Sequence, residues 1–534
     1  MKDLVLSFIH TADLDGSLLS SGNGLQIGTP PRNAILDHHT PHELSSLLSV
    51  SVPSTGLDQA DLKSTVSSIL QYSVNTSSPA FLDKLWSSPS IPGIAADLLL
   101  SCLNGNAHVF RVSPAFTLIE KHVGAELARL FGLDGPFAGG VTVPGGAAAN
   151  STALLIARNV RFPELKELGV AALPQPLAIF VSEAAHFSAF SAAQIMGLGN
   201  RSIRKVTTTA AGTMDPSALR AELEKAVQSG HIPFFVAATA GTTVRGAYDT
   251  LVTIGQLAHE YGAWFHVDAC WGGAVVFSEK LRYKMAGSEL ADSIAFNPHK
   301  MLGVPQICSF LLAKDLRTFW YANRLAAGYL FHEDTEVAQT GAVHNGNGTL
   351  NGTKQTKMIS GDSTNSKWRS SIAMLNVPDP REVYDLASFT PQCGRRPDAL
   401  KLYFHWRYYG SEGMAKHVET AFEAAQYLSR LIADIPFLRH VGGTQVPCTQ
   451  VCFYYNDGPS LTERDPIEEA RWNTHFTRRI AAGLLEKGWM VDYAPGTGRV
   501  GELGEFLRIV CNRLTTLNVV EGLVKAIHSV CAEL

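Results

Sequence analysis

The sequence has little charge, few cysteines and no long hydrophobic run. Charged residues make up 17% of its 534 positions and the net charge is -4, so nothing attracts it generally to nucleic acid or to an anionic membrane. No apolar run approaches the ~20 residues that a membrane helix needs. The apolar patch within Met1–His10 is too short for the core of a signal peptide and has an acid beside it. We therefore expect no nucleic acid partner, no membrane partner and a cytoplasmic location.

The eight cysteines are scattered along the chain, and only Cys448 and Cys452 lie close together. They have no second cysteine pair and no histidine ligands nearby, so a reduced, intracellular protein is the simplest interpretation. A group of acidic and histidine residues, Asp37–His39 with His42, has a spacing that matches no helical or hairpin ligand set. No metal site is predicted.

The chain is long enough, and at 46% hydrophobic residues apolar enough, for two or three domains with their own cores. We predict an N-terminal helical segment over 1–95, a large domain over 96–395 and a small α+β C-terminal domain over 396–534. In the large domain short apolar strands alternate with helical stretches, which indicates an α/β fold with a mostly parallel sheet and helices on both faces. The expected strands are Leu177–Val181, Ile203–Val206, Phe234–Ala238, Trp264–Val267, Ser293–Ala295 and Ser309–Ala313.

An insertion at about 335–385 interrupts this pattern. Its central part, Gly341–Ser371, contains repeated Asn-Gly pairs, many serines and almost no apolar periodicity. A segment of this composition cannot bury enough apolar surface to form a core, so we predict a mobile inserted loop.

Two polar residues end two successive apolar strands of the large domain. Asp268 ends the segment that begins at His266, and Lys300 follows Asn297-Pro298-His299 about thirty positions later. A lysine amine forms a Schiff base with the aldehyde of pyridoxal phosphate (PLP), and a carboxylate pairs with the protonated pyridine nitrogen. The pair therefore indicates a PLP site with Lys300 and Asp268 at its centre.

Three further segments place suitable groups at the same edge of the predicted sheet. A glycine-rich turn at 143–150 joins a strand to a helix, and the free NH groups of a helix N-terminus suit a phosphate. His186 comes just past another strand, in the crevice where open α/β sheets bind ligands, and its flat ring can stack on a pyridine. Thr239 also follows a strand and brings a hydroxyl to this crevice.

With these motifs in order, the chain resembles the group II PLP-dependent amino-acid decarboxylases, and most of all the branch with glutamate, cysteine sulfinate and aspartate decarboxylases. The resemblance runs from about residue 79 to the C-terminus without the insertion, and motifs this long are highly specific. It rests on PGGAAAN at 144–150, SEAAHFSAF at 182–190, ATAGTTVRGAYD at 238–249, HVDACWGG at 266–273, NPHKMLGVPQICS at 297–309 and QCGRRPDALKLYFHWRYYG at 392–410.

The resemblance implies a fold type I PLP enzyme, active as a homodimer with shared active sites at the subunit interface. It implies that Lys300 carries the cofactor, that Asp268 pairs with the ring nitrogen and that His186 stacks on the ring. The remaining residues that it places at the cofactor are Gly146, Ala147 and Ala148 at the phosphate, Asn297 and His299 nearby, Thr239 at the ring edge and Cys270 as a small apolar wall under the ring.

The resemblance also implies roles in catalysis and substrate binding. Tyr329 stands where the family has the tyrosine that protonates the substrate α-carbon after carbon dioxide leaves, a task that a phenol performs well. Relatives with phenylalanine there tend toward aldehyde formation, so the tyrosine favours simple decarboxylation. Arg508 matches an arginine that meets a substrate carboxylate, for which a guanidinium fork is well shaped.

The chain departs from the family pattern where the substrate side chain would bind. Lys84 and Trp86 replace a polar contact of the glutamate decarboxylases, and the segment around His108 also differs. Lys84 and Arg508 favour an acidic amino acid such as aspartate, glutamate or cysteine sulfinate, whereas Trp86 and His108 leave an aromatic or specialised substrate open. An aldehyde synthase and a catalytically silent homologue stay open as further alternatives.

Overall fold

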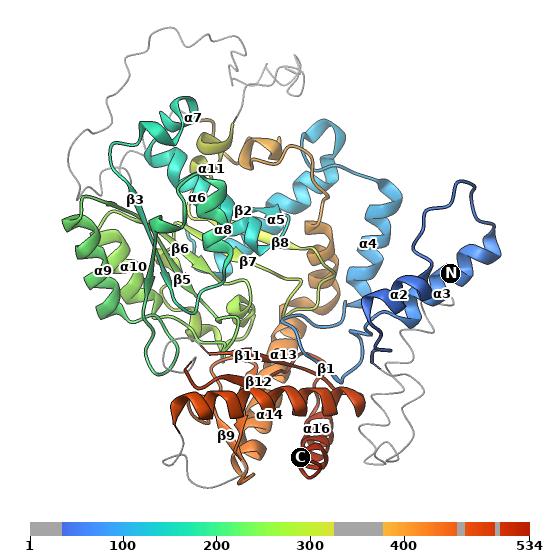
Figure 1. Ribbon diagram of the computed structural model, residues 1–534. Coiled ribbons are helices and arrows are strands. Elements are labelled where there is room, and N and C mark those ends of the chain that lie inside the picture. Colours follow the sequence, from blue (N-terminus) through green and yellow to red (C-terminus); the bar gives the residue numbers. More distant parts are fainter. Residues whose placement is uncertain (1–34, 325–376, 457–464, 497–501) are drawn as a thin grey trace, which may run out of the picture.

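The computed structural model describes residues 35–324, 377–456, 465–496 and 502–534. In these ranges the chain forms a large domain around a seven-stranded sheet and a smaller domain around a five-stranded sheet. In Figure 1 the small domain lies below the large one, and the first helices stand to the right of both.

The large sheet has the order β2-β8-β7-β6-β5-β3-β4. β8 runs antiparallel to both of its neighbours and the other pairs along β7, β6, β5, β3 and β4 are parallel, so the predicted mostly parallel sheet is confirmed. Its strands are β2 (Gly139–Val143), β3 (Leu177–Ser182), β4 (Ile203–Val206), β5 (Ile232–Thr239), β6 (Trp264–Asp268), β7 (Ser293–Phe296) and β8 (Ser309–Ala313).

Both faces of this sheet are buried, which explains the continuous apolar runs of its strands. Along β3, Phe180 packs into one core and its neighbours Ile179 and Val181 pack into the core on the other face. The first core is closed by α5 (Pro114–Leu130), α9 (Pro216–Gln228) and α10 (Leu251–Glu260). The second is closed by α6 (Gly146–Arg161), α8 (Ser188–Ile195) and α11 (Leu316–Asn323). Helices thus cover both faces, as expected.

The small domain combines the C-terminal residues with a strand from near the start of the chain. β1, Phe81–Leu82, pairs in parallel with β11, so the small-domain sheet has the order β1-β11-β12-β10-β9. The segment 1–95, predicted to be helical, therefore also contributes a strand. The other elements are β9 (Leu438–His440), β10 (Gln450–Tyr455), β11 (Met490–Pro495) and β12 (Glu505–Val510), with α14 (Pro466–Glu486) packed on the sheet and α16 (Leu517–Cys531) packed on α13 and α14.

One long helical element joins the two domains. α13 spans Ala399–Ala433 and is interrupted at Gly410. The φ of 66° there is a value that glycine adopts readily and other residues rarely do. Leu402 before this break packs in the large-domain core, whereas Leu428 after it packs in the small-domain core. The predicted boundary at 395/396 therefore falls ahead of an element that belongs to both domains.

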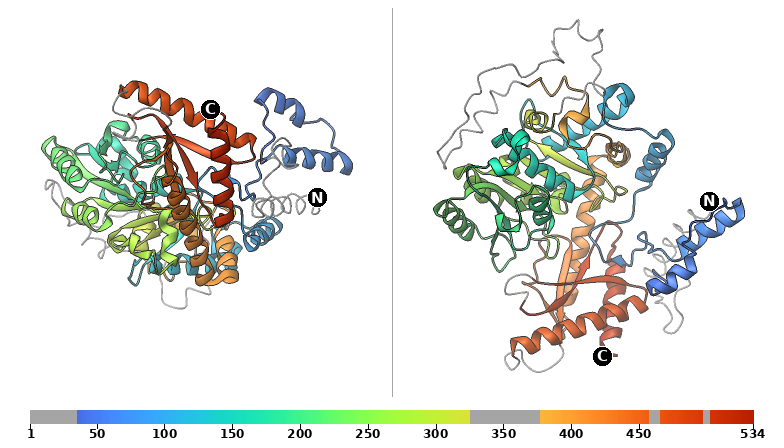
Figure 2. Two further views of the ribbon diagram at one scale, coloured as in Figure 1. Left: turned by 90° about the horizontal axis from the view of Figure 1, so that it is seen from below. Right: turned by 45° about the horizontal axis from the view of Figure 1, so that its top comes forward.

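The first described helices project from the body of the molecule. α2 (Pro41–Leu48) and α3 (Gln59–Gln71) have no buried residue and lie against each other, apart from the rest of the chain in both views of Figure 2. α4 (Ile91–Leu103) packs on α13. Within the described ranges, no helix has the length and apolarity to cross a bilayer.

Candidate active site

The two residues that the sequence singled out lie on neighbouring strands. Asp268 is the last residue of β6, and Lys300 lies in a turn after β7, which pairs in parallel with β6. Thr239 ends β5 directly beside Asp268 in the sheet register. The carboxyl ends of these strands therefore bring all three residues to one edge of the sheet, where ligands bind in open α/β folds.

Asp268 is half-buried and held in its charged form. Burial acts to raise the pKa of this carboxyl, but the Lys300 charge and hydrogen bonds outweigh it, so the pKa lies below its ordinary value. One oxygen, Oδ1, accepts from the Cys270 amide at 3.1 Å, and Oδ2 accepts from the side-chain amide of Asn150 at 2.9 Å. An ionised carboxylate in this position is what a protonated pyridine nitrogen requires.

His186 lies in the same cavity as Asp268 and Thr239. Burial is the main reason that its pKa is lowered, and the nearby Lys300 charge acts in the same direction although Asp268 opposes it. Its Nδ1 accepts a hydrogen bond from the Ser188 amide at 3.2 Å, so the ring is neutral and carries its proton on Nε2. A neutral, half-buried imidazole is suited to stacking on an aromatic ring.

The glycine-rich turn forms the N-terminus of α6. Gly145 has a φ of 107°, and a Cβ on Gly146 would come within 2.7 Å of both Cys270 Sγ and Asn297 Nδ2, so both positions require glycine. No side chain among the described residues caps this helix. The amides of Gly146, Ala147 and Ala148 thus remain available to a phosphate.

Two further observations show that the crevice suits PLP. Asn297 Oδ1 is buried without a hydrogen-bond partner among the described groups, which is costly unless a ligand supplies one. Burial, and next the Asp268 charge, raise the pKa of the Cys270 thiol well above its ordinary value. Cys270 is therefore an uncharged, buried side chain beside the phosphate turn, and its predicted place under the cofactor ring stays a prediction. These residues, with Lys300 and Asp268, could hold the phosphate, ring and aldehyde of the cofactor.

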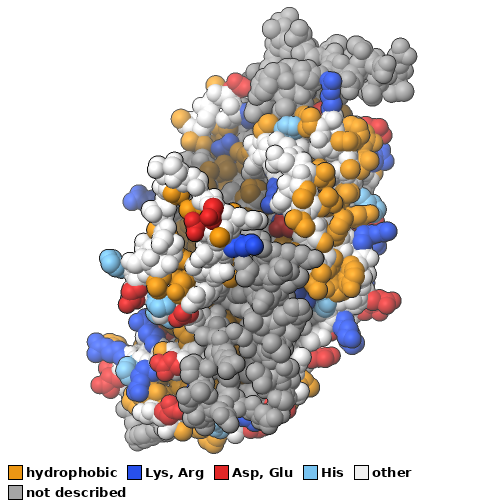
Figure 3. Space-filling model, turned by 90° about the vertical axis from the view of Figure 1, so that its right-hand side faces the viewer, with side chains coloured by type: hydrophobic (Ala, Val, Ile, Leu, Met, Phe, Trp, Pro, Cys, Tyr) orange, Lys and Arg blue, Asp and Glu red, His pale blue; other side chains and the backbone are white. Residues whose placement is uncertain are grey.

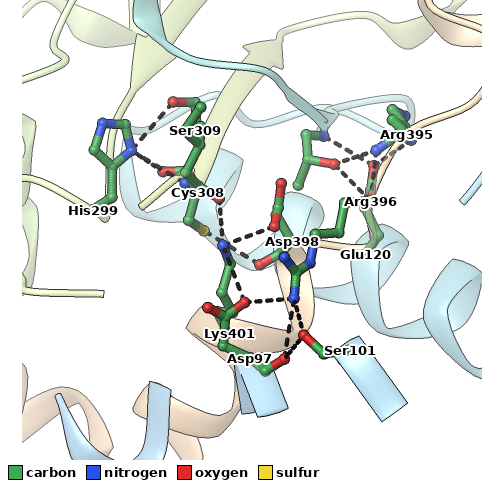
Figure 4. Close-up of polar contacts among 12 residues, drawn as sticks. Asp97, Ser101, Glu120, His299, Cys308, Ser309, Arg395, Arg396, Asp398 and Lys401 are labelled. Carbon is green, nitrogen blue, oxygen red and sulfur yellow. Dashed lines mark hydrogen bonds and ion pairs between the residues drawn. The ribbon is translucent and has the colours of Figure 1, made fainter. Parts of the chain in front are cut away.

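The turn that carries Lys300 is fixed by buried polar contacts (Figure 4). His299, whose pKa burial lowers to about 4, makes a 2.7 Å hydrogen bond from Nδ1 to the Cys308 carbonyl. From α13, Lys401 Nζ donates to the Ile307 carbonyl at 2.6 Å and pairs with Asp398 at 2.8 Å. His299 thus braces the lysine turn, and its predicted contact with the cofactor stays a prediction.

A second buried ion pair fixes the strand that leads into the phosphate turn. Glu120 on α5 accepts from the amide and hydroxyl of Thr142 on β2, both at 2.9 Å. Arg395 pairs with the same carboxylate at 2.6 Å, and the side chains of Arg395 and Glu120 are 6% and 1% exposed. The Arg395–Lys401 segment therefore anchors both of the loops that would hold the cofactor (Figure 4).

Arg508 and Lys84 form a mixed charge cluster between the two domains. Arg508 on β12 donates to the Thr243 carbonyl at 2.9 Å, in the loop that follows Thr239, and pairs with Asp492 on β11. Lys84 lies 3.0 Å from Asp492 and 3.1 Å from Asp83. Burial acts to lower the pKa of Lys84, but these two carboxylates raise it overall. Two cations and two carboxylates thus lie together on one wall, where the Arg508 side chain is 6% exposed and the Lys84 side chain is 46% exposed.

Two other predicted residues, Trp86 and His108, lie elsewhere. Trp86 packs on the small-domain core, with its ring 5.7 Å from that of Phe81. The His108 ring accepts from the Val109 amide at 2.7 Å, and the His108 carbonyl accepts from Ala387. None of these contacts joins Trp86 or His108 to the Lys300 crevice. Tyr329 lies outside the described residues.

The structure adds residues that sequence reasoning had not assigned to the site. Asn150 and His266 support Asp268, Lys401 and Arg395 anchor the loops, and Asp492 pairs with Arg508. Asn150 and His266 lie inside the PGGAAAN and HVDACWGG motifs, so the sequence marks both residues. It does not show which side chains they contact. Asp492 carried no such signal, because only strand pairing places it opposite Arg508.

A sequence model of the pyridoxal-dependent decarboxylase conserved domain matches residues 41–345 and 366–456. The chain belongs to this decarboxylase family. A glutamate decarboxylase-like protein of Gibberella zeae is 49% identical over 474 residues, which cover 89% of this chain and 88% of the relative. An L-aspartate decarboxylase of Metarhizium robertsii is 38% identical over 535 residues, covering 99% of this chain and 95% of the relative.

Solved structures agree with the fold of this decarboxylase. Mouse CSAD superposes with a TM-score of 0.79 at 27% identity, covering 98% of this chain and 99% of the other. Oryza sativa TDC, solved with PLP and tryptamine, gives 0.78 at 23% identity over 100% and 98% of the two chains. The fold is that of fold type I PLP enzymes, and the predicted family, cofactor and enzyme class are confirmed.

The decarboxylase is thus a PLP-dependent carboxy-lyase. Bound PLP supplies the electron sink that accepts the pair left at the substrate α-carbon when carbon dioxide departs. Lys300 would supply the amine for its aldehyde, and Asp268 would supply a fixed negative charge for its ring nitrogen. The α6 amides would hold the phosphate, and His186 would offer a neutral ring to its face.

Proposed function

We propose that this decarboxylase removes the α-carboxyl group of an acidic L-amino acid and that L-aspartate is its leading substrate. The observation that carries the proposal is the cation pair of Arg508 and Lys84, which share the Asp492 carboxylate on the wall between the domains. A substrate carboxylate that took the place of Asp492 would meet a guanidinium fork and an ammonium group together.

The relatives support this choice of substrate class. The protein named as an L-aspartate decarboxylase aligns with nearly the whole of this chain, whereas the more similar relative is named only as glutamate decarboxylase-like. We therefore rank aspartate above glutamate and cysteine sulfinate.

The test is carbon dioxide release by the purified, PLP-loaded enzyme with L-aspartate, L-glutamate, L-cysteine sulfinate, L-tyrosine and L-tryptophan. We expect the largest kcat/KM for aspartate, with an amine as product. Arg508→Lys keeps the charge but loses the fork, so KM for aspartate should rise at least tenfold. Arg478→Lys, which alters an exposed pair with Glu505 on the small domain, is the matched control. A preference for an aromatic substrate, or equal KM values in both variants, would contradict the proposal.

We also propose that the active unit is a homodimer. The side chains of Ile91, Leu98 and Leu103 on α4 are 77%, 66% and 57% exposed, and hydrophobic side chains gather on the side of the molecule seen in Figure 3. Val112 is 57% exposed in the segment that follows. Apolar surface of this extent is typical of an interface, and a second copy of the chain is the partner that the family favours.

The oligomeric state tests this part of the proposal. Light scattering during gel filtration should give twice the mass of the chain, and the double substitution Leu98→Glu with Leu103→Glu should shift the mass to that of a monomer. Leu168→Glu, at an equally exposed leucine on the distant helix α7 (Leu165–Leu168), should leave a dimer. A monomeric wild-type protein at micromolar concentration with full activity would refute it.

A further inference from the structure

A chain of hydrogen bonds, buried at its start and part-buried at its end, leads from the interior of the large sheet to Asp268. Trp264 Nε1 lies 2.8 Å from Ser293 Oγ, and Ser293 Oγ lies 2.9 Å from His266 Nδ1. His266 Nε2 lies 3.0 Å from Asn150 Oδ1, and Asn150 Nδ2 lies 2.9 Å from Asp268 Oδ2. The chain thus links three adjacent elements, β7, β6 and the first turn of α6.

The chemistry of each group gives this chain one direction. An indole NH only donates, so Ser293 accepts from Trp264 and its own hydroxyl proton is free for His266 Nδ1. Burial is the main cause that lowers the pKa of His266 to about 4, so the ring is neutral and its single proton lies on Nε2. That proton is donated to the Asn150 carbonyl oxygen, and the Asn150 amide donates to Asp268.

One Asp268 oxygen accepts the last hydrogen bond of this series, from the Asn150 side chain, and the other accepts from the Cys270 amide. Both donors favour the ionised carboxylate over the neutral acid. The titratable groups that face Asp268 are Lys300, His266, His186 and Cys270. The first is a cation, and the other three are held neutral by burial. The uncharged amide of Asn150 is therefore the side chain that fixes the orientation of Asp268.

We propose that Asn150 and His266 are positioning residues that orient Asp268 and keep it ionised for the ring nitrogen of PLP. They act through Asp268 and do not touch the reacting atoms. The inference concerns only the cofactor, so it holds whichever amino acid is decarboxylated.

The decisive variant is Asn150→Asp, which keeps the shape of the side chain and replaces its donor by an acceptor. At pH 7.5 two carboxylates would then lie about 3 Å apart, and their repulsion would disfavour the ionised, oriented form of Asp268. We expect the dissociation constant of PLP from the apoenzyme, measured by tryptophan fluorescence, to rise at least tenfold at pH 7.5. At pH 5.5 the added carboxyl is protonated and again donates to Asp268, so the loss should shrink to less than threefold.

Asn159→Asp is the matched control. Asn159 is a buried asparagine on the same helix, and its amide donates to the Ala322 carbonyl away from the cofactor. Its variant should show no pH-dependent change in PLP affinity. Wild-type affinity in Asn150→Asp at pH 7.5, or a loss of the same size at both pH values, would overturn the proposal.

His266 provides a second test if Asn150→Asp fails to fold. His266→Gln keeps one acceptor for Ser293 and one donor for Asn150, so it should retain PLP affinity within threefold. His266→Phe keeps the ring that stacks on Phe235 at 5.5 Å but breaks the chain, so it should lose affinity at least tenfold and shift the visible absorbance of the bound cofactor. Equal affinity of the two variants would show that His266 acts only through packing.

Discussion

Replacing Lys401 by methionine should destabilise the protein by about 3–5 kcal/mol, the usual cost of removing one partner of a buried ion pair. The Lys401 side chain is 1% exposed, pairs with Asp398 at 2.8 Å and donates to the Ile307 carbonyl at 2.6 Å. Methionine fills nearly the same space but leaves the Asp398 carboxylate and this carbonyl without their partner. The cost is therefore electrostatic and does not arise from a cavity.

The pH dependence of this loss distinguishes the charge effect from poor packing. Burial already raises the pKa of Asp398 above its ordinary 3.8, and Lys401 is the largest influence that lowers it. Without Lys401 the folded-state pKa should rise further, so the variant loses stability as pH rises through that value and recovers it as Asp398 is protonated. The deficit should be largest above pH 7 and smaller near pH 5.

Urea unfolding followed by fluorescence at both pH values measures the deficit, with apparent midpoints used because a protein of two domains need not unfold in one step. Lys225→Met is the control, since that lysine pairs with Glu222 on the surface with side chains 66% and 27% exposed. Its loss should stay within about 1 kcal/mol. A deficit below about 1 kcal/mol for Lys401→Met, or one that is the same at both pH values, would refute the reasoning.

Three further predictions concern catalysis. Asp268→Asn should lower kcat by about 10²–10³-fold, the size of effect seen when one fixed electrostatic partner is removed, and steady-state kinetics within threefold of wild type would contradict this. Tyr329→Phe should still release carbon dioxide, but mass spectrometry should show more aldehyde or ketone by-products, because a phenylalanine cannot protonate the α-carbon. Formation of amine alone at the normal rate would show that Tyr329 takes no part in the reaction. Mixing Lys300→Ala with Tyr329→Phe subunits should restore part of the amine-forming activity if Tyr329 serves the partner's site, and no recovery after verified subunit exchange would place each site within one chain.

The sequence was informative where function requires residues at strand ends and glycine turns. Lys300, Asp268 and Thr239 could be placed together because each follows a buried parallel strand, and the register of β5, β6 and β7 agrees. The α6 turn could be placed because only glycine fits at positions 145 and 146.

The sequence was less informative where a role depends on contacts between distant segments. The sequence shows no acidic partner for Arg508, but antiparallel pairing of β11 with β12 places Asp492 opposite it. The place of His299 before Lys300 predicts a cofactor contact, but only the fold shows the hydrogen bond between its ring and the Cys308 carbonyl. β1 escaped prediction because two residues carry no periodic pattern, and its partner lies at Met490.

That pairing has a consequence for biosynthesis. The edge of the C-terminal sheet is completed by Phe81–Leu82, and Ile35 lies in the same core. The ribosome therefore delivers one piece of the small domain at the start and the rest at the end, with the whole large domain synthesised in between. Pairings between segments so far apart in sequence form slowly. β1 therefore stays unpaired until β11 has been synthesised. A chaperone that covers the segment around β1 during synthesis should raise the yield of native enzyme more than one that acts on the finished chain.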